Sequence, residues 1–450
     1  MSVVVHPPNF KNHLLLQGDK LFDLLQRINA PDFQSIITKA NHQYLHWHKF
    51  RYIHPLPEGV THEELWAFLK IGREANKKLV PFKDKDEVSF TYWIPDSLFK
   101  LLHEIDLWGG GTLTTDTSGF LPAKEPYIIS SLMEEAIASS QLEGAATTRK
   151  VAKEMLRSGR KPRDVSERMI LNNWETMQYI RENCHENFSL ERILDLHKII
   201  TTDTLQNPEE AGRLRNRDDI IVEYNQETVH IPPNATTLPE RIQQLCDFAN
   251  RDQADNWIHP IFKGAIIHFV LAYDHPFTDG NGRTARALMY WYLLSRNYVL
   301  FEYLSISRYM RSAPAKYVQA FLFTETDSND LTYFLFYNLK AIHRAIHNLK
   351  AYLQKKQKEV ENSNIQLRSI RGLNPRQKML VHHALAHPYA EYTIETHKNH
   401  HAIVYQTARQ DLLDLEKKGY LKKEKIGREF SFFPSPTIGE KLKTGSRRTN

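Results

Sequence analysis

The sequence is poor in cysteine and contains no long uninterrupted apolar run. Its two cysteines, Cys184 and Cys246, stand in no recognisable motif. Two cysteines in a chain of 450 residues argue against a disulfide framework and are typical of the reducing cytoplasm. The longest apolar stretch, residues 287–304, is interrupted by Arg296, Asn297 and Glu302. We therefore expect a cytoplasmic protein with no membrane-spanning helix and no membrane partner.

A secretory signal, internal repeats and low-complexity tracts are also missing. Residues 1–17 lack the basic start, apolar run and small-residue cleavage site of a signal peptide. Hydrophobic residues make up 41% and charged residues 25% of the chain, which are values of a soluble globular protein. A chain of 450 residues is longer than a single hydrophobic core usually supports, so the sequence predicts two to four domains.

The positive charge is concentrated at the C-terminal end. Residues 371–450 hold 15 Lys and Arg against 8 Asp and Glu, whereas the other 370 residues hold 44 against 45. The formal net charge of +6 therefore comes from the last 80 residues. Such an asymmetry is compatible with a domain that faces nucleic acid, but charge alone favours a solvated basic surface.

Helical periodicity dominates residues 127–353, where apolar side chains recur at spacings of three and four. Residues 220–231 are the exception. There Ile220-Ile221-Val222 and Val229-His230-Ile231 flank polar residues around Asn225, and Pro232-Pro233 follows, which predicts a short β-hairpin. The fold class is therefore mainly α with a small β-hairpin.

The C-terminal end predicts a separate module. Residues 351–370 are rich in Lys, Gln, Glu, Asn and Ser and are typical of a helix end that runs into a linker. A helix is then expected over Pro375–Leu385, and a second within residues 401–418 that ends at Gly419. Two short strands around Lys425 and Arg428 complete the order of a winged helix-turn-helix over residues 371–436.

Twelve contiguous residues, 275–286, carry groups suited to phosphate chemistry. Gly280-Asn281-Gly282 stands at the expected start of a helix, where free N–H groups and the helix dipole favour phosphate oxygens. Arg283 and Arg286 lie three residues apart, on one helical face, and suit further phosphate oxygens. Asp279 is an oxygen ligand suited to Mg²⁺. His275 is a base whose ordinary pKa lies near neutral pH.

The segment resembles the Fic-family motif His-x-Phe-x-(Asp/Glu)-Gly-Asn-Gly-Arg-x-x-Arg at every fixed position. The resemblance covers about residues 120–345 and implies an all-α core of roughly eight helices. It also implies an enzyme that transfers AMP from ATP, with Mg²⁺, to a Ser, Thr or Tyr hydroxyl of a protein, self-modification included. His275 then resembles the base, Phe277 the buried anchor and Asp279 the Mg²⁺ ligand. The remaining motif positions resemble nucleotide contacts: Asn281 at the α-phosphate, Gly280, Gly282 and Arg283 in the anion hole, and Arg286 at the γ-phosphate.

The family resemblance extends to an inhibitory pattern, (Ser/Thr)-x-x-x-Glu-(Gly/Asn), which Ser139, Glu143 and Gly144 match. Ser139 and Glu143 are four residues apart and share one face of a helix expected over residues 125–144. A carboxylate there would pair with Arg286 and occupy the place of the γ-phosphate. The alternative is a solvated helix end.

The hairpin resembles the family's flap, which holds the target by strand addition through Val222, Val229, His230 and Ile231. A plain surface hairpin is the alternative. In the C-terminal module, Tyr405, Gln406, Thr407 and Arg409 are candidates for a DNA major groove, with Lys425 and Arg428 near phosphates. The alternative is that the same module makes protein contacts or forms a homodimer.

The expected organisation is an N-terminal region (residues 1–120), a Fic domain with its inhibitory helix (121–350), a linker (351–370) and a winged helix (371–436). Protein adenylylation repressed by Glu143 is the leading function. Removal of AMP by the same site is a second reading. A DNA-binding regulator whose pocket only senses nucleotide is a third, although such a sensor has no use for the base His275.

Overall fold

The computed structural model describes residues 4–10, 18–27, 29–109, 124–251, 257–369, 372–387, 390–401, 403–426 and 429–438. The chain divides into two compact units, Met1–Leu349 and Lys350–Asn450. The fold is mainly helical, as predicted. The predicted boundary at residue 120 falls outside the described residues, and the finer domain division stays a prediction.

The N-terminal part of the first unit is a small helical layer with one two-stranded sheet. It contains α2 (Gly18–Gln26), α3 (Pro31–Gln43), α4 (Trp47–Phe50), α5 (His62–Glu74), β1 (Lys78–Lys83), β2 (Ser89–Tyr92) and α6 (Asp96–Gly109). Helix α5 begins with a capping box in which Thr61 and Glu64 satisfy each other's backbone N–H groups. Buried aromatic side chains, including Phe33, Phe50 and Trp66, form its core.

Buried ion pairs tie this layer to the turn between α15 (Pro314–Thr326) and α16 (Thr332–Ser369). Lys70 Nζ lies 2.9 Å from Asp327 Oδ1, and Lys77 Nζ lies 3.1 Å from Asp330 Oδ2. Lys70 and Asp330 are fully buried. Because unpaired buried charges are costly, these pairs fix the N-terminal layer against the helical core.

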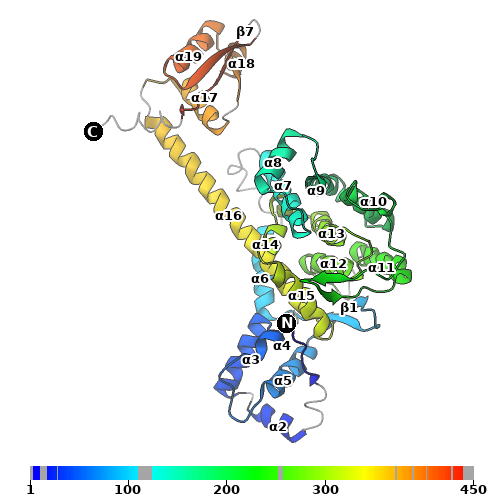
Figure 1. The fold of residues 1–450 in the computed structure, drawn as a ribbon. Helices are drawn as coiled ribbons and strands as arrows, with labels where there is room; N and C mark the ends of the chain where they lie inside the picture. Colours follow the sequence, from blue (N-terminus) through cyan, green and yellow to red (C-terminus); the bar gives the residue numbers. More distant parts are fainter. Residues whose placement is uncertain are drawn as a thin grey trace. The chain divides into compact units, whose positions relative to one another are not determined.

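The helical core surrounds two nearly buried helices, α12 (Pro260–Asp274) and α13 (Asn281–Ser295), which lie side by side (Figure 1). Most residues of both are buried, which agrees with the largely apolar sequence of α12 and of the second half of α13. The surrounding helices are α7 (Lys124–Leu142), α8 (Arg149–Ser158), α9 (Val165–Asn183), α10 (Leu190–Thr201), α11 (Leu238–Asn250) and α14 (Ser307–Ser312). Helix α7 packs against α9 and α14. Helices α12 and α13 thus hold the motif loop between them at the centre of the unit.

The predicted hairpin is present and shorter than expected. Strands β3 (Val222–Tyr224) and β4 (Glu227–His230) pair antiparallel, and the pairing is irregular after Val222. Asn225 and Gln226 have φ angles of 52° and 66°, as a two-residue hairpin turn requires. Residues 220, 221 and 231, predicted as strand, lie outside it.

The second unit has more elements than the sequence predicted. It contains α17 (Pro375–Ala386), β5 (Tyr392–Thr393), α18 (Ile394–His401), α19 (Tyr405–Lys417), β6 (Leu421–Ile426) and β7 (Glu429–Pro434), with the sheet order β5-β7-β6. Val381, Leu412, Leu415 and Phe432 are buried in its core. The winged-helix assignment stays a prediction, and Arg428 lies outside the described residues.

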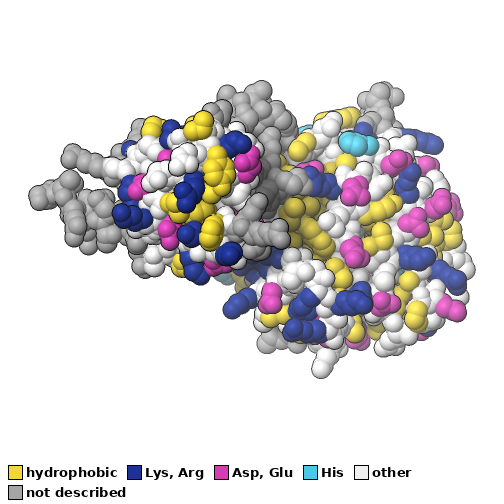
Figure 2. Space-filling view, turned by 90° about the horizontal axis from the view of Figure 1, so that it is seen from above, with side chains coloured by type: hydrophobic (Ala, Val, Ile, Leu, Met, Phe, Trp, Pro, Cys, Tyr) yellow, Lys and Arg dark blue, Asp and Glu magenta, His cyan; other side chains and the backbone are white. Residues whose placement is uncertain are grey.

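One expectation for this end of the chain is corrected, and one helix was not predicted. Residues 351–369 continue α16 as helix, because Lys, Gln and Glu are good helix formers. The segment 394–401, which was not predicted as an element, forms the separate helix α18. None of the described helices is long and apolar enough to cross a membrane. On the side drawn in Figure 2, Lys and Arg side chains are interspersed with Asp and Glu.

Candidate active site

The motif loop is bounded by two residues with positive φ. Helix α12 ends at His275, whose φ of 45° and ψ of 56° lie in the left-handed region. Helix α13 begins after Gly280, whose φ is 82°. A left-handed conformation is natural for Gly280 but costs roughly 1–2 kcal/mol at a residue with a Cβ, such as His275. Backbone strain of this kind is found where the surrounding structure holds a functional side chain in place.

The centre of the loop is fixed by Phe277 and Asn281. Phe277 is fully buried. The Asn281 amide is bonded twice to it: Oδ1 accepts from the Phe277 N–H at 2.9 Å, and Nδ2 donates to the Phe277 carbonyl at 2.8 Å. Asn281 therefore clamps the loop, a role that its sequence position did not predict. Its contact with the α-phosphate stays a prediction.

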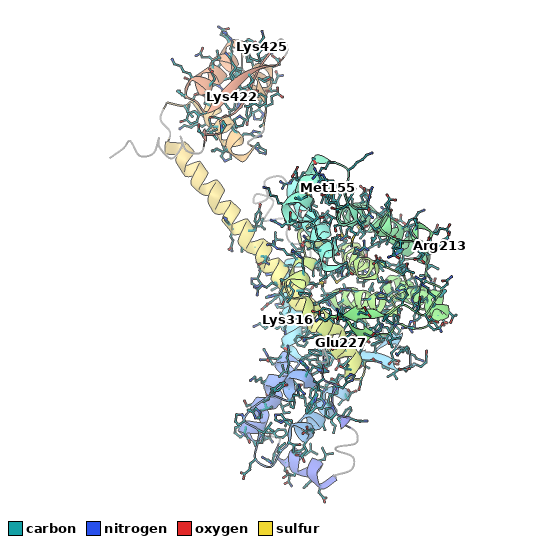
Figure 3. The ribbon with its side chains drawn as sticks, in the orientation of Figure 1. Met155, Arg213, Glu227, Lys316, Lys422 and Lys425 are labelled. Carbon is teal, nitrogen blue, oxygen red and sulfur yellow. The ribbon has the colours of Figure 1, made fainter. Side chains whose placement is uncertain are left out.

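Two residues outside the motif also hold the loop, and sequence reasoning missed both. His197 on α10 stacks on Phe277 with ring centroids 3.7 Å apart and bonds the Asp279 carbonyl at 2.9 Å. The buried Arg215 donates from Nε to the His275 carbonyl at 2.9 Å, and its backbone N–H donates to Pro276. Arg215 lies two residues after Arg213, which is labelled in Figure 3, and before the hairpin. Neither residue stands in a motif, so no local signal marks them.

His275 is placed as a neutral base. Its Nδ1 lies 3.3 Å from the Ala272 carbonyl and donates to it, which leaves the lone pair of Nε2 free. Burial lowers the pKa of His275 to about 4, and the nearby His230 and Arg215 add to the effect. An imidazole that is neutral at pH 7 accepts a proton.

The start of α13 is an anion site. Arg283 is 1% exposed, and burial lowers the pKa of its guanidinium. Its Nη1 donates to the Ile200 carbonyl at 3.2 Å, whereas Nε and Nη2 have no hydrogen-bond partner among the described residues. A buried guanidinium beside a helix N-terminus suits an anionic ligand, since its Nε has no partner among the described residues and its Nη2 is only 3.5 Å from the exposed Asp279 carboxylate.

Asp279 lies at the rim of this site. Its side chain is 58% exposed, and Oδ2 lies 3.5 Å from Arg283 Nη2. No group of three or more His, Cys, Asp or Glu residues in the described part of the chain is arranged to hold a metal ion. A single exposed carboxylate next to a phosphate site nevertheless fits Mg²⁺, which is commonly held by one or two carboxylates together with substrate phosphates and water.

The carboxylate of Glu143 lies beside Arg286 and the first turn of α13. Its Oε1 forms an ion pair with Arg286 Nη1 at 2.9 Å, and the Arg286 side chain is 1% exposed. Ser139 accepts from the same guanidinium twice, with its hydroxyl at 2.9 Å from Nε and its carbonyl at 3.1 Å from Nη2. A Cβ atom at Gly282 would overlap the Glu143 carboxylate, so this carboxylate lies directly against the first turn of α13. Gly144 follows with a φ of 95°.

Helix α7, which carries Ser139, is anchored by a buried carboxyl that sequence reasoning also missed. Glu135 is 1% exposed, and burial raises its pKa. It accepts hydrogen bonds from the Ser305 hydroxyl at 3.1 Å, the Ser307 N–H at 3.0 Å and the Ser307 hydroxyl. This contact joins α7 to the start of α14.

The hairpin is attached to the site through His230. Nε2 of His230 donates to the Tyr273 carbonyl at 2.7 Å, and Nδ1 pairs with Glu325 at 2.7 Å. Val222 and Val229 are half-buried and Ile231 is 52% exposed. Glu227, at the start of β4, is labelled in Figure 3. The role of these residues in target binding stays a prediction.

Comparison with known proteins gives a match that contains most of this site. Residues 187–293 match the model of the Fic/DOC family. The chain is 34% identical over 105 residues to protein adenylyltransferase fic-1 of Caenorhabditis elegans, covering 23% of this chain and 19% of the relative. It is 31% identical over 123 residues to protein adenylyltransferase Fic of Nematostella vectensis, covering 27% of each. The chain thus matches about a fifth to a quarter of these relatives' length.

Solved structures agree on the fold. A Fic family protein from Desulfovibrio desulfuricans superposes with a TM-score of 0.52 at 16% identity, covering 75% of this chain and 96% of that one. Fic-1 of Caenorhabditis elegans superposes with a TM-score of 0.50 at 17% identity, covering 77% of this chain and 92% of that one. The family match includes His197, Arg215 and residues 275–286 and leaves out Ser139 and Glu143. Residues 187–293 are therefore similar to the Fic/DOC family, and the fold of the chain is that of Fic proteins.

Proposed function

We propose that the chain is a protein adenylyltransferase, which transfers AMP from ATP to a Ser, Thr or Tyr hydroxyl of a protein. The named relatives support the reaction. The observation that carries the proposal is the neutral His275, with Nε2 free, on the loop that leads into an anion site with unused Arg283 donors. A general base beside a phosphate site suits attack by a hydroxyl on phosphorus.

In the proposed reaction the target hydroxyl attacks the α-phosphorus of ATP. The new bond joins the hydroxyl oxygen to phosphorus, the bond between the α-phosphorus and its bridging oxygen breaks, and pyrophosphate leaves. Nε2 of His275 takes the hydroxyl proton. The N–H groups of Gly280 and Gly282 with Arg283 stabilise the negative charge on the phosphates. The triphosphate itself favours the protonated imidazole, which offsets the low pKa of His275.

Mg²⁺ fits this proposal as a partner of the phosphates. Asp279 is the residue that would hold it, because its carboxylate is exposed at the rim of the anion site. When bound, the ion neutralises phosphate charge. The chain's own residues bind and orient the nucleotide and move the proton.

We further propose that Glu143 represses the reaction. Its carboxylate lies where an anionic phosphate would reach Arg286 and the first turn of α13. ATP must displace a charge-assisted contact that is already made, and such contacts are worth roughly 1.5–3 kcal/mol. Removal of AMP, with Glu143 orienting a water molecule, is the second candidate, since Glu143 is close enough to His275 to influence its pKa.

The test of the reaction is mass spectrometry of the purified chain with Mg²⁺ and ATP, alone and with lysate proteins. We expect AMP adducts on the chain or on targets, and more of them in the Glu143→Gly variant. Loss of AMP from a pre-modified target, without any gain of adducts, would instead support the removal reaction.

DNA is the partner that we propose for the second unit, and protein contacts or a homodimer would use the same surface. Tyr405, Gln406 and Arg409 are exposed near the start of α19, and Lys422, Lys423 and Lys425 are exposed on β6. Figure 3 labels Lys422 and Lys425 on this strand. Polar side chains on a helix next to a basic strand suit base edges and phosphates. The two free cysteines, both buried, support a reducing compartment such as the cytoplasm.

A further inference from the structure

We propose that His197 is a positioning residue for the reaction: its Nε2–H holds the Asp279 carbonyl and thereby aims the Gly280 N–H into the anion site. The proposal rests on the proposed function for its activity readout, and it has a binding readout of its own. His197 belongs to α10, 82 residues away from Asp279 in the sequence.

The hydrogen bonds of His197 define a single tautomer. The Gly212 backbone N–H lies 3.0 Å from Nδ1. A backbone N–H only donates, so Nδ1 is the acceptor. In a neutral imidazole the hydrogen is then on Nε2, which donates to the Asp279 carbonyl at 2.9 Å. Burial lowers the pKa of His197 to about 4, which keeps the ring neutral near pH 7.

The ring has no room to move. His197 is fully buried and parallel to Phe277 within 5°. Gly280 is also close: a Cβ atom added to it would come within 2.9 Å of Thr201 Cγ2 and 3.4 Å of His197 Nε2. His197 and Thr201 are one turn apart on α10, so this helix lies directly against the start of the anion site.

Peptide geometry links the hydrogen bond of His197 to the chemistry. The Asp279 carbonyl and the Gly280 N–H belong to the same planar trans peptide, and they point in opposite directions. With the carbonyl directed at α10, the N–H is directed away from it. In the free protein this N–H donates to the side chain of Asp279 itself. A phosphate oxygen would replace that local bond, and the exposed Asp279 carboxylate would be released.

Two amide substitutions separate the two hydrogen bonds of His197. A Gln amide nitrogen reaches about as far as Nε2, so His197→Gln keeps a donor for the Asp279 carbonyl. An Asn amide oxygen reaches about as far as Nδ1, so His197→Asn keeps an acceptor for the Gly212 N–H. His197→Phe keeps the stack on Phe277 and loses both bonds. Only His197→Gln keeps the contact with the Asp279 carbonyl to which the proposal assigns a role.

The experiment uses the full chain with Glu143→Gly, so that the anion site is open. Calorimetry measures the affinity for a non-hydrolysable ATP analogue. Labelled ATP measures the rate of AMP transfer, and fluorescence measures the melting temperature. We expect His197→Gln to stay within a few-fold of its parent. His197→Asn and His197→Phe should lose about tenfold or more in both affinity and rate, which is the effect of losing about one hydrogen bond to a polar partner.

Equal losses in the Gln and Asn variants, or losses that simply follow the melting temperature, would overturn the proposal and leave His197 a core residue. The binding measurement needs no transfer activity. If the parent chain transfers no AMP but binds the analogue, the proposed function fails, and the comparison of the three variants still decides the role of His197.

Discussion

At the scale of the residue, the site depends on His275 being neutral and free at Nε2. We predict that His275→Ala abolishes AMP transfer and leaves nucleotide affinity within a few-fold of the parent. The base acts on the proton of the acceptor, whereas the phosphates are bound by backbone N–H groups and arginines. Labelled-AMP incorporation and calorimetry measure the two effects. Transfer at the parent's rate in this variant would remove His275 from the mechanism.

Three buried histidines and the half-buried His275 make the stability of the protein sensitive to acid. Burial lowers the pKa of His46 and His268 to about 3 and that of His197 and His275 to about 4. Below the ordinary value of about 6.5, the unfolded chain binds protons that the folded chain does not. The folded state is therefore fully favoured above pH 6.5 and loses stability as the pH falls toward 4.

We predict that the melting temperature falls by several degrees between pH 7.5 and pH 5.5. His268→Gln is the matched variant, because His268 is fully buried and lies outside the motif, with Nε2 2.8 Å from the Tyr317 hydroxyl. The variant should lower stability at pH 7.5 and flatten its dependence on pH by up to about 1.4 kcal/mol per unit. An unchanged slope would mean that His268 protonates without unfolding.

At the scale of the element, helix α7 carries Ser139 and leads into Glu143, and both residues contact Arg286. Glu135 fixes this helix to the start of α14 through Ser305 and Ser307. We predict that Glu135→Gln raises basal AMP transfer severalfold, less than removal of Glu143 does. A Gln amide has one acceptor oxygen where the carboxylate has two, so it loses part of the contact and loosens α7.

Labelled-AMP incorporation measures the effect of Glu135→Gln. Glu134→Gln, the neighbouring control on α7, removes ion pairs with Arg149 and Lys153 of α8 and should leave the rate unchanged. Equal rates for Glu135→Gln and the parent would show that α7 is held by its apolar packing alone.

The motif elements were predictable from the sequence, and their supporting residues were not. Residues 275–286 are contiguous, so their order alone indicates an anion site between two helices. His197 and Glu135 contact partners 82 and 172 residues away, and a histidine or glutamate in an amphipathic helix carries no local mark of such a contact. The hairpin was predictable because its alternation and turn residues are local.

At the scale of the whole molecule, the chain consists of two units with different charge. Helix α18 escaped prediction because its sequence, rich in His, Lys and Asn, has no clear apolar stripe. The continuation of α16 through Ser369 escaped for the opposite reason, since a polar composition typical of linkers also forms helix readily.

We predict that the chain binds duplex DNA through the second unit and that the affinity falls steeply with salt. Basic side chains that neutralise phosphates release counterions, and each contact adds about 0.9 to the logarithmic salt slope. Fluorescence anisotropy at several salt concentrations measures the affinity for DNA and its dependence on salt. Lys422→Gln with Lys425→Gln should reduce the slope, whereas Lys316→Gln, in the first unit, should not change it. Binding that is independent of salt, or absent at low salt, would favour the protein-contact alternative.

The central claim is that a Fic site capable of AMP transfer is held closed by the Glu143–Arg286 ion pair. The most direct test is the rate of labelled-AMP incorporation by the parent, Glu143→Gly and Glu143→Gln under equal Mg²⁺ and ATP. Glutamine keeps the size of the side chain and removes its charge, so it controls for the flexibility that glycine adds to the end of α7.

Since a charge-assisted contact of roughly 1.5–3 kcal/mol is removed, and each 1.4 kcal/mol is about tenfold in occupancy, we predict a rise of at least about tenfold for Glu143→Gly and a clear rise for Glu143→Gln. Equal rates for all three proteins would contradict the account and make Glu143 an ordinary helix-end residue.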